Sequence, residues 1–327
     1  MWKSFKTSAW LSAVISLSTF CSCWNACAQT YPVRPIRMLV GFAPGGGTDA
    51  IARVVAQKMA DELRQPVVVE NRPGADSAIA NERVAKSMAD GYTLLMLTSS
   101  STIHPSLRKE IPYKVEHDLA PVSLVVVGPY VLVVNPSLAA RNVKELIALA
   151  QSQPGKLNSG FTGVGSTTHL AGELFNLMAK VNIVRVPYKG GAEGAVATAA
   201  DQVQMTYASI TAVLPLIDSG RLRALAVTSA KRAALMPQVP TIAESGLSDY
   251  DRSTWYGVVV PTGVPREIIS RLNKIIGETS NTAEVKSMFD KLGFYAQPGT
   301  PEQFSALIKR ELTENAKLVK AIGLKPE

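Results

Sequence analysis

The sequence predicts an α/β protein made of two tandem units, each a mostly parallel sheet flanked by helices. Short apolar runs alternate with helical patterns from Pro35 onward, which is typical of parallel strands joined by helices. Two β-rich segments, near 123–131 and 252–258, interrupt this alternation. With 327 residues, of which 46% are hydrophobic, the chain is long enough for two globular domains of ordinary size.

The first unit begins with a strand, a helix and a second strand. Residues 36–40 form an apolar run that predicts a buried strand. The helix that follows carries apolar residues every four positions, at Ile51, Val55, Met59 and Leu63. Further strands are predicted at 67–69 and 93–97, with a helical stretch over 81–87 between them.

The second unit begins after "VSLVVVGPYVLVV", where two β-rich runs meet at Gly128-Pro129. A capping box at Asn142 and Glu145 predicts a helix through Ala150, and Ser166 can cap a helix that runs to about Lys180. The remaining strands are predicted at 157–161, 183–186, 203–207, 224–227 and 253–261. The C-terminal helices are predicted at 266–277, at 282–292 and from the capping box Thr300-Pro301-Glu302-Gln303.

The N-terminus has the pattern of a secretory signal peptide. Two lysines precede an apolar run over 9–20, and Ala26-Cys27-Ala28 supplies a cleavage pattern of small residues. The run is short and interrupted by serines, unlike a membrane span, and the residues before its cysteines fit a lipoprotein site poorly. Cleavage after Ala28 removes all three cysteines, so the mature chain has no disulfide and no thiolate site. We expect a mature protein in the periplasm.

This order of elements also predicts the domain boundaries. We expect a signal peptide at 1–28, a first lobe formed by 29–125 plus 256–327, and a second lobe at 126–255. The two β-rich segments would then be hinge crossings between the lobes.

Charge and composition exclude several functional classes. The net charge of +8 falls by two, to +6, when Lys3 and Lys6 leave with the signal peptide, a segment that holds no acid. The remaining excess slightly favours an acidic ligand, but no dense run of basic residues with interleaved aromatics predicts nucleic-acid binding. The three histidines, His104, His117 and His169, are widely spaced and lack the pairing of metal ligands. Neither a nucleophile signature nor a cofactor fingerprint is present. We therefore expect no metal, no cofactor and no enzymatic activity.

The segment "GFAPGGGTD", 41–49, joins the first strand to the first helix. Such glycine-rich turns let backbone N–H groups point at an anion, and the following helix adds its positive end. A phosphate-binding loop requires a lysine after the last glycine, but Gly47 is followed by Thr48 and Asp49. A small carboxylate fits this loop better. Asp49 either contacts the ligand or only stabilises the helix start and orients the loop.

A second loop of this kind, "FTGVGSTTH" at 161–169, follows a strand of the other unit. Ser166 and His169 lie three residues apart at a helix start, where both could donate hydrogen bonds into a cleft; His169 could equally be a structural residue. "VPYKGGAEG", 186–194, is a third candidate, in which Lys189 is either an ion-pairing group or a solvated charge. One anion-binding loop in each unit predicts a cleft that closes on a ligand with two charged ends.

Taken together, the motifs resemble the tripartite tricarboxylate receptors, the periplasmic solute-binding proteins called Bug receptors. The resemblance covers essentially the whole mature chain. It is carried by "YPVRPIRMLVGFAPGGGTDAIAR", "VVVENRPGA", "ADGYTLLM", "VPYKGG", "LRALAVTSAKR", "VPTIAESG" and "STWYG". It implies a two-lobed Venus-flytrap fold that holds a di- or tricarboxylate, an acidic amino acid or an aromatic acid and delivers it to membrane transporter subunits.

The resemblance also implies a set of ligand-binding residues. One wall of the cleft would be formed by Phe42, Ala43, Gly45, Gly46, Gly47, Thr48 and Asp49. The other wall would be formed by Gly163, Gly165, Ser166 and His169, and a further family motif matches Tyr188, Lys189 and Gly190. Ser99 and Ser209 represent the loops after Leu97 and Tyr207.

The sequence departs from the family pattern at two positions. Gly74-Ala75-Asp76-Ser77 stands where the family usually has Gly-Ala-Gly-Gly, and Ala192-Glu193 stands where Ala-Pro is common. An acid that faces the cleft would meet an ammonium or hydroxyl group of the ligand, whereas an acid that faces solvent would have no effect. We expect Asp76 to face the cleft and Glu193 to face solvent.

Other functions share these features. The same lobes could report a solute to a membrane signalling protein, and an enzyme acting on a small acid is a further alternative. The primary expectation is a monomeric receptor for a small carboxylate, and the sequence does not specify which carboxylate.

Overall fold

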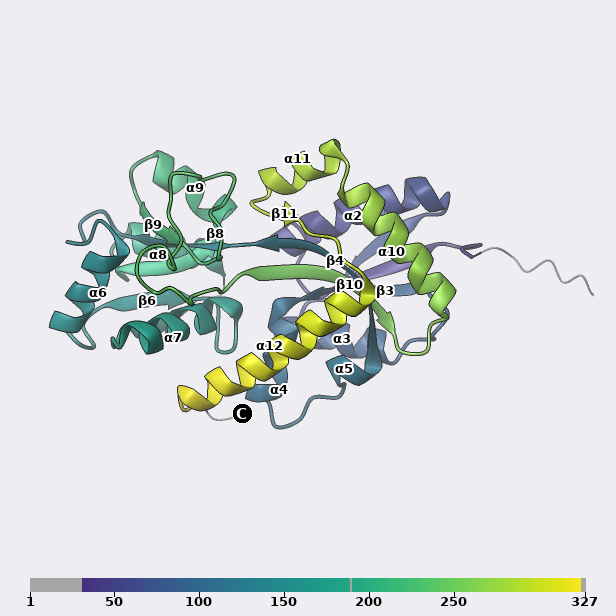
Figure 1. Ribbon diagram of the computed structural model, residues 1–327, viewed down its shortest axis with the longest axis horizontal. Coiled ribbons are helices and arrows are strands. Elements are labelled where there is room, and N and C mark those ends of the chain that lie inside the picture. The colour runs from purple at the N-terminus through teal and green to yellow at the C-terminus, as the bar shows by residue number, and fades with distance from the viewer. Residues whose placement is uncertain (1–30, 189, 325–327) are drawn as a thin grey trace, which may run out of the picture. The chain divides into compact units, whose positions relative to one another are not determined.

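A computed structural model describes residues 31–188 and 190–324, which form two β-sheets flanked by helices (Figure 1). The predicted signal peptide, residues 1–28, lies outside the described residues. No helix in the described part of the chain is both long and apolar enough to cross a membrane.

The first sheet contains six strands in the order β11–β4–β10–β3–β1–β2. These strands are β1 (Ile36–Val40), β2 (Val67–Asn71), β3 (Thr93–Thr98), β4 (Leu119–Gly128), β10 (Thr254–Pro261) and β11 (Tyr295–Ala296). The accompanying helices are α2 (Gly47–Leu63), η1 (Ala75–Ser77), α3 (Ala78–Ala85), η2 (Ser99–Thr102), α4 (His104–Leu107), α5 (Val115–Asp118), α10 (Arg266–Ser280), α11 (Ala283–Lys291) and α12 (Pro301–Ala321). This sheet is therefore completed by the C-terminal part of the chain.

The second sheet contains five strands in the order β7–β6–β8–β5–β9. These strands are β5 (Tyr130–Val134), β6 (Asn158–Phe161), β7 (Val184–Pro187), β8 (Met205–Ser209) and β9 (Arg223–Val227). The accompanying helices are α6 (Val143–Ser152), α7 (Thr167–Ala179), α8 (Gly191–Ala199) and α9 (Ile210–Asp218).

Two strands carry the chain between the sheets. β4 continues into β5 with only Pro129 between them, and β10 returns to the first sheet, where it lies beside β4 (Figure 1). β10 runs antiparallel to β3, and β5 runs antiparallel to β8, whereas β1–β3 and β6–β8 contain the parallel pairs. Both sheets are therefore mixed rather than mostly parallel as predicted. A crossing strand leaves one sheet at the carboxyl ends of its parallel strands. It enters the other sheet at the carboxyl ends of that sheet's parallel strands, and it is therefore antiparallel to them.

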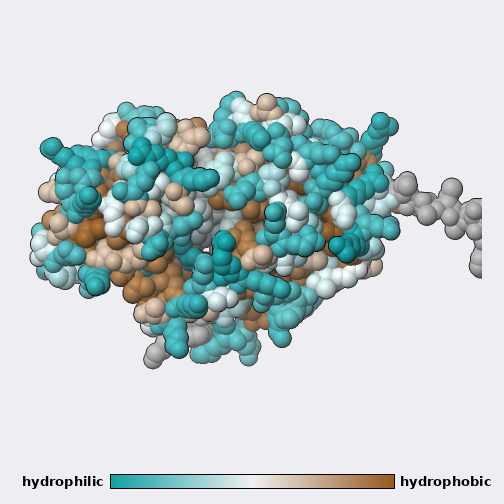
Figure 2. Space-filling model, in the orientation of Figure 1, coloured by the Kyte–Doolittle hydropathy of each residue, from teal (hydrophilic) through white to brown (hydrophobic). Residues whose placement is uncertain are grey.

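Each sheet has its own apolar core. In the first, Trp255 and Phe304 pack edge to face with ring centroids 5.2 Å apart, and both side chains are almost fully buried. In the second, Phe175 and Tyr207 lie among buried aliphatic residues. Burying a large apolar side chain contributes roughly 1.5–3 kcal/mol, so such clusters stabilise each sheet. Hydrophilic side chains cover most of the face shown in Figure 2.

The predicted helix starts are confirmed. The Asn142 side chain accepts a hydrogen bond from the Glu145 N–H at 2.9 Å. The Glu145 carboxylate accepts from the Arg141 N–H and from the Asn142 side-chain amide, both at 2.7 Å, rather than from the Asn142 N–H of a complete capping box. Thr300 and Gln303 form the complete capping box of α12. Local polar spacing therefore locates these helices without help from tertiary contacts.

Candidate functional site

The loops that follow the parallel strands of both sheets meet at the crossing strands. This follows from the strand directions. Both crossings, β4–β5 and β10, meet the first sheet at the carboxyl ends of β1 and β3, and they meet the second sheet at the carboxyl ends of β6 and β8. Contacts between the sheets agree with it. The Ser99 hydroxyl, after β3, lies 3.0 Å from the Thr254 hydroxyl on β10 and 3.4 Å from the Thr167 hydroxyl at the start of α7. Carboxyl ends of parallel strands are the usual place for a ligand in an open α/β sheet.

The glycine loop after β1 is held in shape by one buried carboxylate. Asp49 is 3% exposed, and its oxygens accept hydrogen bonds at 2.9 Å from the Gly45 N–H, the Arg53 guanidinium and the Asn71 amide. Burial raises the pKa of the Asp49 carboxyl, but these hydrogen bonds and the charge of Arg53 outweigh burial and hold the pKa below its ordinary value. Because both oxygens are engaged, Asp49 orients the loop.

The same loop leaves the start of α2 without a side-chain cap. The N-cap residue is Gly46, which has no side chain to accept from the first N–H groups of the helix. The first helical bond is donated by the Ala50 N–H to the Gly46 carbonyl, so the amides before it have no intrahelical acceptor. The segment Ala43–Gly47 is exposed, whereas Thr48 is buried. The arrangement offers amide donors and a positive helix end to an anion.

The loop after β6 differs, because its own side chains occupy the start of α7. The Ser166 hydroxyl accepts from the His169 N–H at 3.1 Å and so caps the helix. His169 is 4% exposed, stacks on Phe161, and accepts from the Gly165 N–H through Nδ1 at 3.2 Å. Its Nε2 lies 3.4 Å from a carboxylate oxygen of Glu173. These contacts give His169 a structural role in shaping the loop.

Glycines are required in that loop by its backbone. Gly163 has φ +111° and Gly165 has φ +81°, values that favour glycine. Gly165 also lies against Leu107 of α4, since a Cβ atom there would stand 2.5 Å from the Leu107 Cδ1. The loop of the second sheet therefore touches a helix that belongs to the first.

The remaining predicted residues lie after β7 and β8. Tyr188 packs beside Gly160 and Gly194, Gly190 is the N-cap of α8, and Ser209 is the N-cap of α9. Neither α8 nor α9 has a side-chain cap, so both resemble α2 in this respect. Lys189 lies outside the described residues.

Sequence reasoning did not single out the polar side chains of the crossing strands. Burial raises the pKa of the Tyr256 hydroxyl, with a further rise from Tyr130 and an opposing hydrogen bond with Thr48. Burial likewise raises the pKa of Tyr130, against hydrogen bonds with Thr254 and Thr167. Both tyrosines remain neutral and can donate a hydrogen bond. Within β-rich runs these residues read only as strand formers, and a GPY or STWYG pattern carries no local signal of a site.

Of the two unusual acids, Glu193 is exposed in the first turn of α8. Asp76 lies in η1, and its Oδ2 is 3.1 Å from Nε2 of the buried His104. The Asp76 side chain is 34% exposed.

Comparisons with known proteins agree with this architecture. Residues 51–324 match the tripartite tricarboxylate transporter family receptor. Protein BugT of Bordetella pertussis is 42% identical over 300 residues, which cover 91% of this chain and 92% of that protein.

Solved structures are similar over the same length. An R. palustris protein, Rpa4515 with adipate, aligns with a TM-score of 0.82 at 33% identity, covering 91% of this chain and all of the other. MatC from Rhodopseudomonas palustris with bound malate aligns with a TM-score of 0.76 at 28% identity, covering 88% of this chain and all of the other. The two-sheet fold with crossing strands is thus that of periplasmic binding proteins of this type. The chain belongs to the tripartite tricarboxylate transporter receptor family, whose members are solute-binding receptors.

Proposed function

We propose that this protein is a periplasmic receptor that captures a small carboxylate between its two sheets and delivers it to a membrane transporter. The observation that carries the proposal is the uncapped start of α2, which follows an exposed loop that Asp49 holds through the Gly45 amide. A carboxylate oxygen that accepts from the amides at that helix start completes their hydrogen bonding. The adipate and malate bound to two relatives support this ligand class.

The proposed ligand-binding residues follow from that arrangement. Residues 42–49, 163–166 and the starts of α8 and α9 would surround the ligand, and Ser99 would line the base. The donors would be those amides that do not already bond within the loops, as the Gly45, Gly165 and Ser166 amides do. The first lobe would comprise 29–125 plus 256–327 and the second 126–255, with closure by rotation at the crossing strands. Closure joins both sets of donors only when a ligand lies between them.

The signal peptide and its cleavage after Ala28 belong to this proposal. Delivery to the periplasm requires such a leader, and the sequence pattern of residues 1–28 supplies one.

A matched pair of variants at Gly47 tests the amide donors directly. Gly47 is the first residue of α2, where proline is well tolerated, and Gly46 has φ −79° and ψ 169°, which suit a residue before proline. Gly47→Pro removes one N–H, whereas Gly47→Ala keeps it. A hydrogen bond to a charged group is worth about 1.5–3 kcal/mol, so we expect the proline variant to bind roughly ten- to hundredfold more weakly than the alanine variant.

The ligand class is established first by titration of residues 29–327 after unfolding and refolding to remove bound solute. Matched acids are titrated by calorimetry while the emission of Trp255, the one tryptophan of this segment, is followed. Ligand at about 100 times its Kd should add about 2.7 kcal/mol to the free energy of unfolding. Absence of binding by di-, tri-, amino and aromatic acids would contradict the proposal, as would equal affinities of the two Gly47 variants.

A further inference from the structure

Asp76 is the end of a chain of hydrogen bonds that begins inside the first sheet's core. The Asn81 amide donates to the Tyr113 hydroxyl oxygen at 2.9 Å. The Tyr113 hydroxyl lies 3.1 Å from His104 Nδ1, and His104 Nε2 lies 3.1 Å from Asp76 Oδ2. Because the Tyr113 oxygen accepts from Asn81, its proton is free to go to Nδ1. His104 is then the neutral tautomer whose Nε2–H donates to Asp76.

The other oxygen of Asp76 is available. In the described part of the chain, Oδ2 accepts the His104 hydrogen bond and Oδ1 accepts none. The side chain is 34% exposed, while that of His104 is 4% exposed. Ser77, the next residue, packs directly against Gly41, so closely that a Cβ atom on Gly41 would clash with it; Asp76 therefore lies beside the glycine loop that follows β1. The carboxylate is therefore fixed through one oxygen, while the other is left without a partner among the described residues, on a partly exposed side chain.

The backbone around Asp76 is strained. Ala75, Asp76 and Ser77 have φ values of +48°, +52° and +75°, a left-handed run without a glycine. Such a conformation costs roughly 1–2 kcal/mol per residue and persists only where neighbouring contacts impose it. The Arg108 guanidinium supplies one of these contacts by donating to the Ala75 carbonyl at 2.8 Å. This contact helps to hold the segment that carries Asp76 in one conformation.

We propose that Asp76 selects carboxylic acids that also carry an ammonium or hydroxyl group. The inference rests on the proposed function, because it assigns the ligand class of the same cleft. A fixed carboxylate repels a plain dicarboxylate but accepts a hydrogen bond from a ligand donor, most strongly from an ammonium group. His104 is a positioning residue that holds Asp76 through Nε2–H.

Matched acids with and without a donor test the selection. Succinate, malate and aspartate share one carbon skeleton, and longer or aromatic pairs extend the series. We expect aspartate or malate to bind about tenfold or more tightly than succinate, and Asp76→Asn to remove most of that ratio. Asp76→Gly should do the same while raising the thermal midpoint, because glycine relieves the strain. The control Glu267→Gln, at an exposed position of α10 outside the proposed cleft, should leave the ratio unchanged.

His104 is tested through the same ratio. His104→Ala should lower it, and His104→Gln, which keeps a donor, should restore part of it. A ratio that Asp76→Asn leaves unchanged overturns the inference while the receptor function stands. Failure of the parent protein to bind any acid overturns the proposed function instead.

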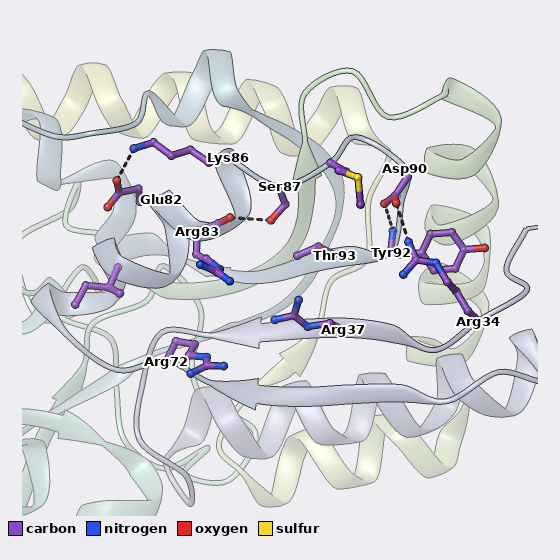
Figure 3. A pocket seen from close by; sticks show the side chains of 12 residues that line it. Arg34, Arg37, Arg72, Glu82, Arg83, Lys86, Ser87, Asp90, Tyr92 and Thr93 are labelled. Atoms are coloured by element: carbon purple, nitrogen blue, oxygen red, sulfur yellow. Dashed lines mark hydrogen bonds and ion pairs between the residues drawn. The ribbon is translucent and has the colours of Figure 1, made fainter.

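A basic groove lies beside α3 (Figure 3). It has a cavity volume of about 740 Å³, and Arg37, Arg72 and Arg83 surround one hollow with Arg34 and Asp90 at its end. Its strand residues lie toward the amino ends of β1 and β3, opposite the ends that carry the glycine loops. The groove continues to Arg72, which follows the carboxyl end of β2, and to Ile79 of α3, so one of its ends approaches the segment that carries Asp76.

Positive charge exceeds negative charge in the groove. Arg34 pairs with Asp90 at 2.8 Å and Lys86 with Glu82 at 2.6 Å. Arg37 and Arg72 share the carboxylate of Glu70. The Arg83 side chain, exposed on α3, has no ion-pair partner among residues 31–188 and 190–324. An acidic partner would complete these charges.

We propose that this groove docks an acidic segment of the membrane transporter, an inference that rests on the proposed function. Exposed Ile79 and Met88, at 52% and 73%, flank the cations and provide apolar contacts that a peptide can use. Glu82 and Asp90 would repel a uniformly anionic surface. They would also fix the position of a bound peptide along the groove.

Charge reversal tests the docking. Arg83→Glu with Lys86→Glu is compared with Lys274→Glu and Lys286→Glu, which reverse two exposed charges on α10 and α11. We expect both pairs to keep the Kd for the acid, and only the first to reduce uptake by cells that hold the transporter, by about tenfold or more. A changed Kd in the first pair, or unchanged uptake, overturns the docking inference. Lack of uptake with the parent protein overturns the proposed function.

Discussion

Asp49 shows how one side chain can organise a binding loop without contacting the ligand. It joins the Gly45 amide, the Arg53 guanidinium and the Asn71 amide, which come from the loop, from α2 and from the end of β2. The sequence allowed both a contact role and an orienting role. It could not choose between them, because Asn71 is brought close only by the pairing of β1 with β2.

Asp49→Asn should therefore reduce both stability and affinity. Loss of a charge-assisted buried hydrogen bond costs about 1–3 kcal/mol. The cost of losing the Arg53 interaction lies at the lower end of this range, because the Arg53 side chain is exposed to solvent. Because the folded-state pKa of Asp49 lies below its ordinary value of 3.8, its stabilisation is complete above that value. It is lost as the pH falls through the folded-state pKa. Urea unfolding at neutral and acidic pH measures this, and an equal difference at both pH values would contradict it.

Two buried tyrosines differ in whether their hydroxyl groups have a hydrogen-bond partner. The Tyr250 hydroxyl donates to the Ala171 carbonyl at 2.9 Å, whereas the Tyr207 hydroxyl has no partner in the described part of the chain. Tyr207→Phe should raise the free energy of unfolding by about 1 kcal/mol, since it removes an unsatisfied polar group. Tyr250→Phe should lower it by a similar amount. Parallel denaturant titrations check the pair, and equal signs would show that the two hydroxyls are equivalent.

At the scale of elements, local patterns located most helices and strands. Apolar spacing predicted α2 and β1, and polar caps predicted α6 and α12, because these signals act within a few residues. β11 has two residues, Tyr295–Ala296, and no periodicity reveals so short a strand. Strand direction also escaped prediction, because it depends on which sheet a strand enters.

Variants of Ser166 test how much a single side-chain cap stabilises a helix. Its hydroxyl accepts from the His169 N–H, so Ser166→Ala should destabilise the protein by about 1 kcal/mol, and Ser166→Asp should restore the cap. Thr300→Ala, at the start of α12 and away from the proposed cleft, should cost a similar amount. Thermal unfolding measures all three. No loss in Ser166→Ala would mean that the hydroxyl does not act as the cap.

Glu311 joins α12 to the first sheet. Its carboxylate accepts from the Trp255 indole N–H at 2.7 Å and from the Thr102 hydroxyl at 3.1 Å. Burial raises its pKa, and these hydrogen bonds and Arg252 only partly oppose the rise. The parent should therefore lose stability relative to Glu311→Gln as the pH rises from the ordinary value of 4.5 through the folded-state pKa. Unfolding followed by Trp255 emission checks this, and a constant gap would refute it.

At the scale of the whole molecule, order along the chain predicted two units, and the resemblance supplied the family. Neither could place Asp76 against His104, or Tyr130 beside Thr254 and Thr167, because those approaches depend on how loops from different strands meet. The positions of the glycine loops were therefore better predicted than the contacts of the polar groups between them. The predicted domain boundaries and site residues remain predictions.

Gly128 lies where β4 passes into β5, and it should limit movement between the sheets. A Cβ atom there would stand 2.5 Å from the Phe294 Cδ1 and 3.1 Å from the Gly293 carbonyl oxygen. Gly128→Ala should destabilise the protein by about 1–3 kcal/mol through overpacking. Gly277→Ala, in open space on α10, should instead stabilise it by roughly 0.5–1 kcal/mol. Thermal unfolding and small-angle scattering, each with and without the acid, check this. A Gly128→Ala variant with the stability and the movement of the parent protein would contradict it.

The place of β10 in its sheet has a consequence for how the chain is made. β10 lies between β3 and β4, yet it consists of residues 254–261, which leave the ribosome long after both neighbours. Until they emerge, the growing polypeptide cannot close its first sheet. The six-strand order of that sheet can therefore form only after most of the polypeptide has been synthesised.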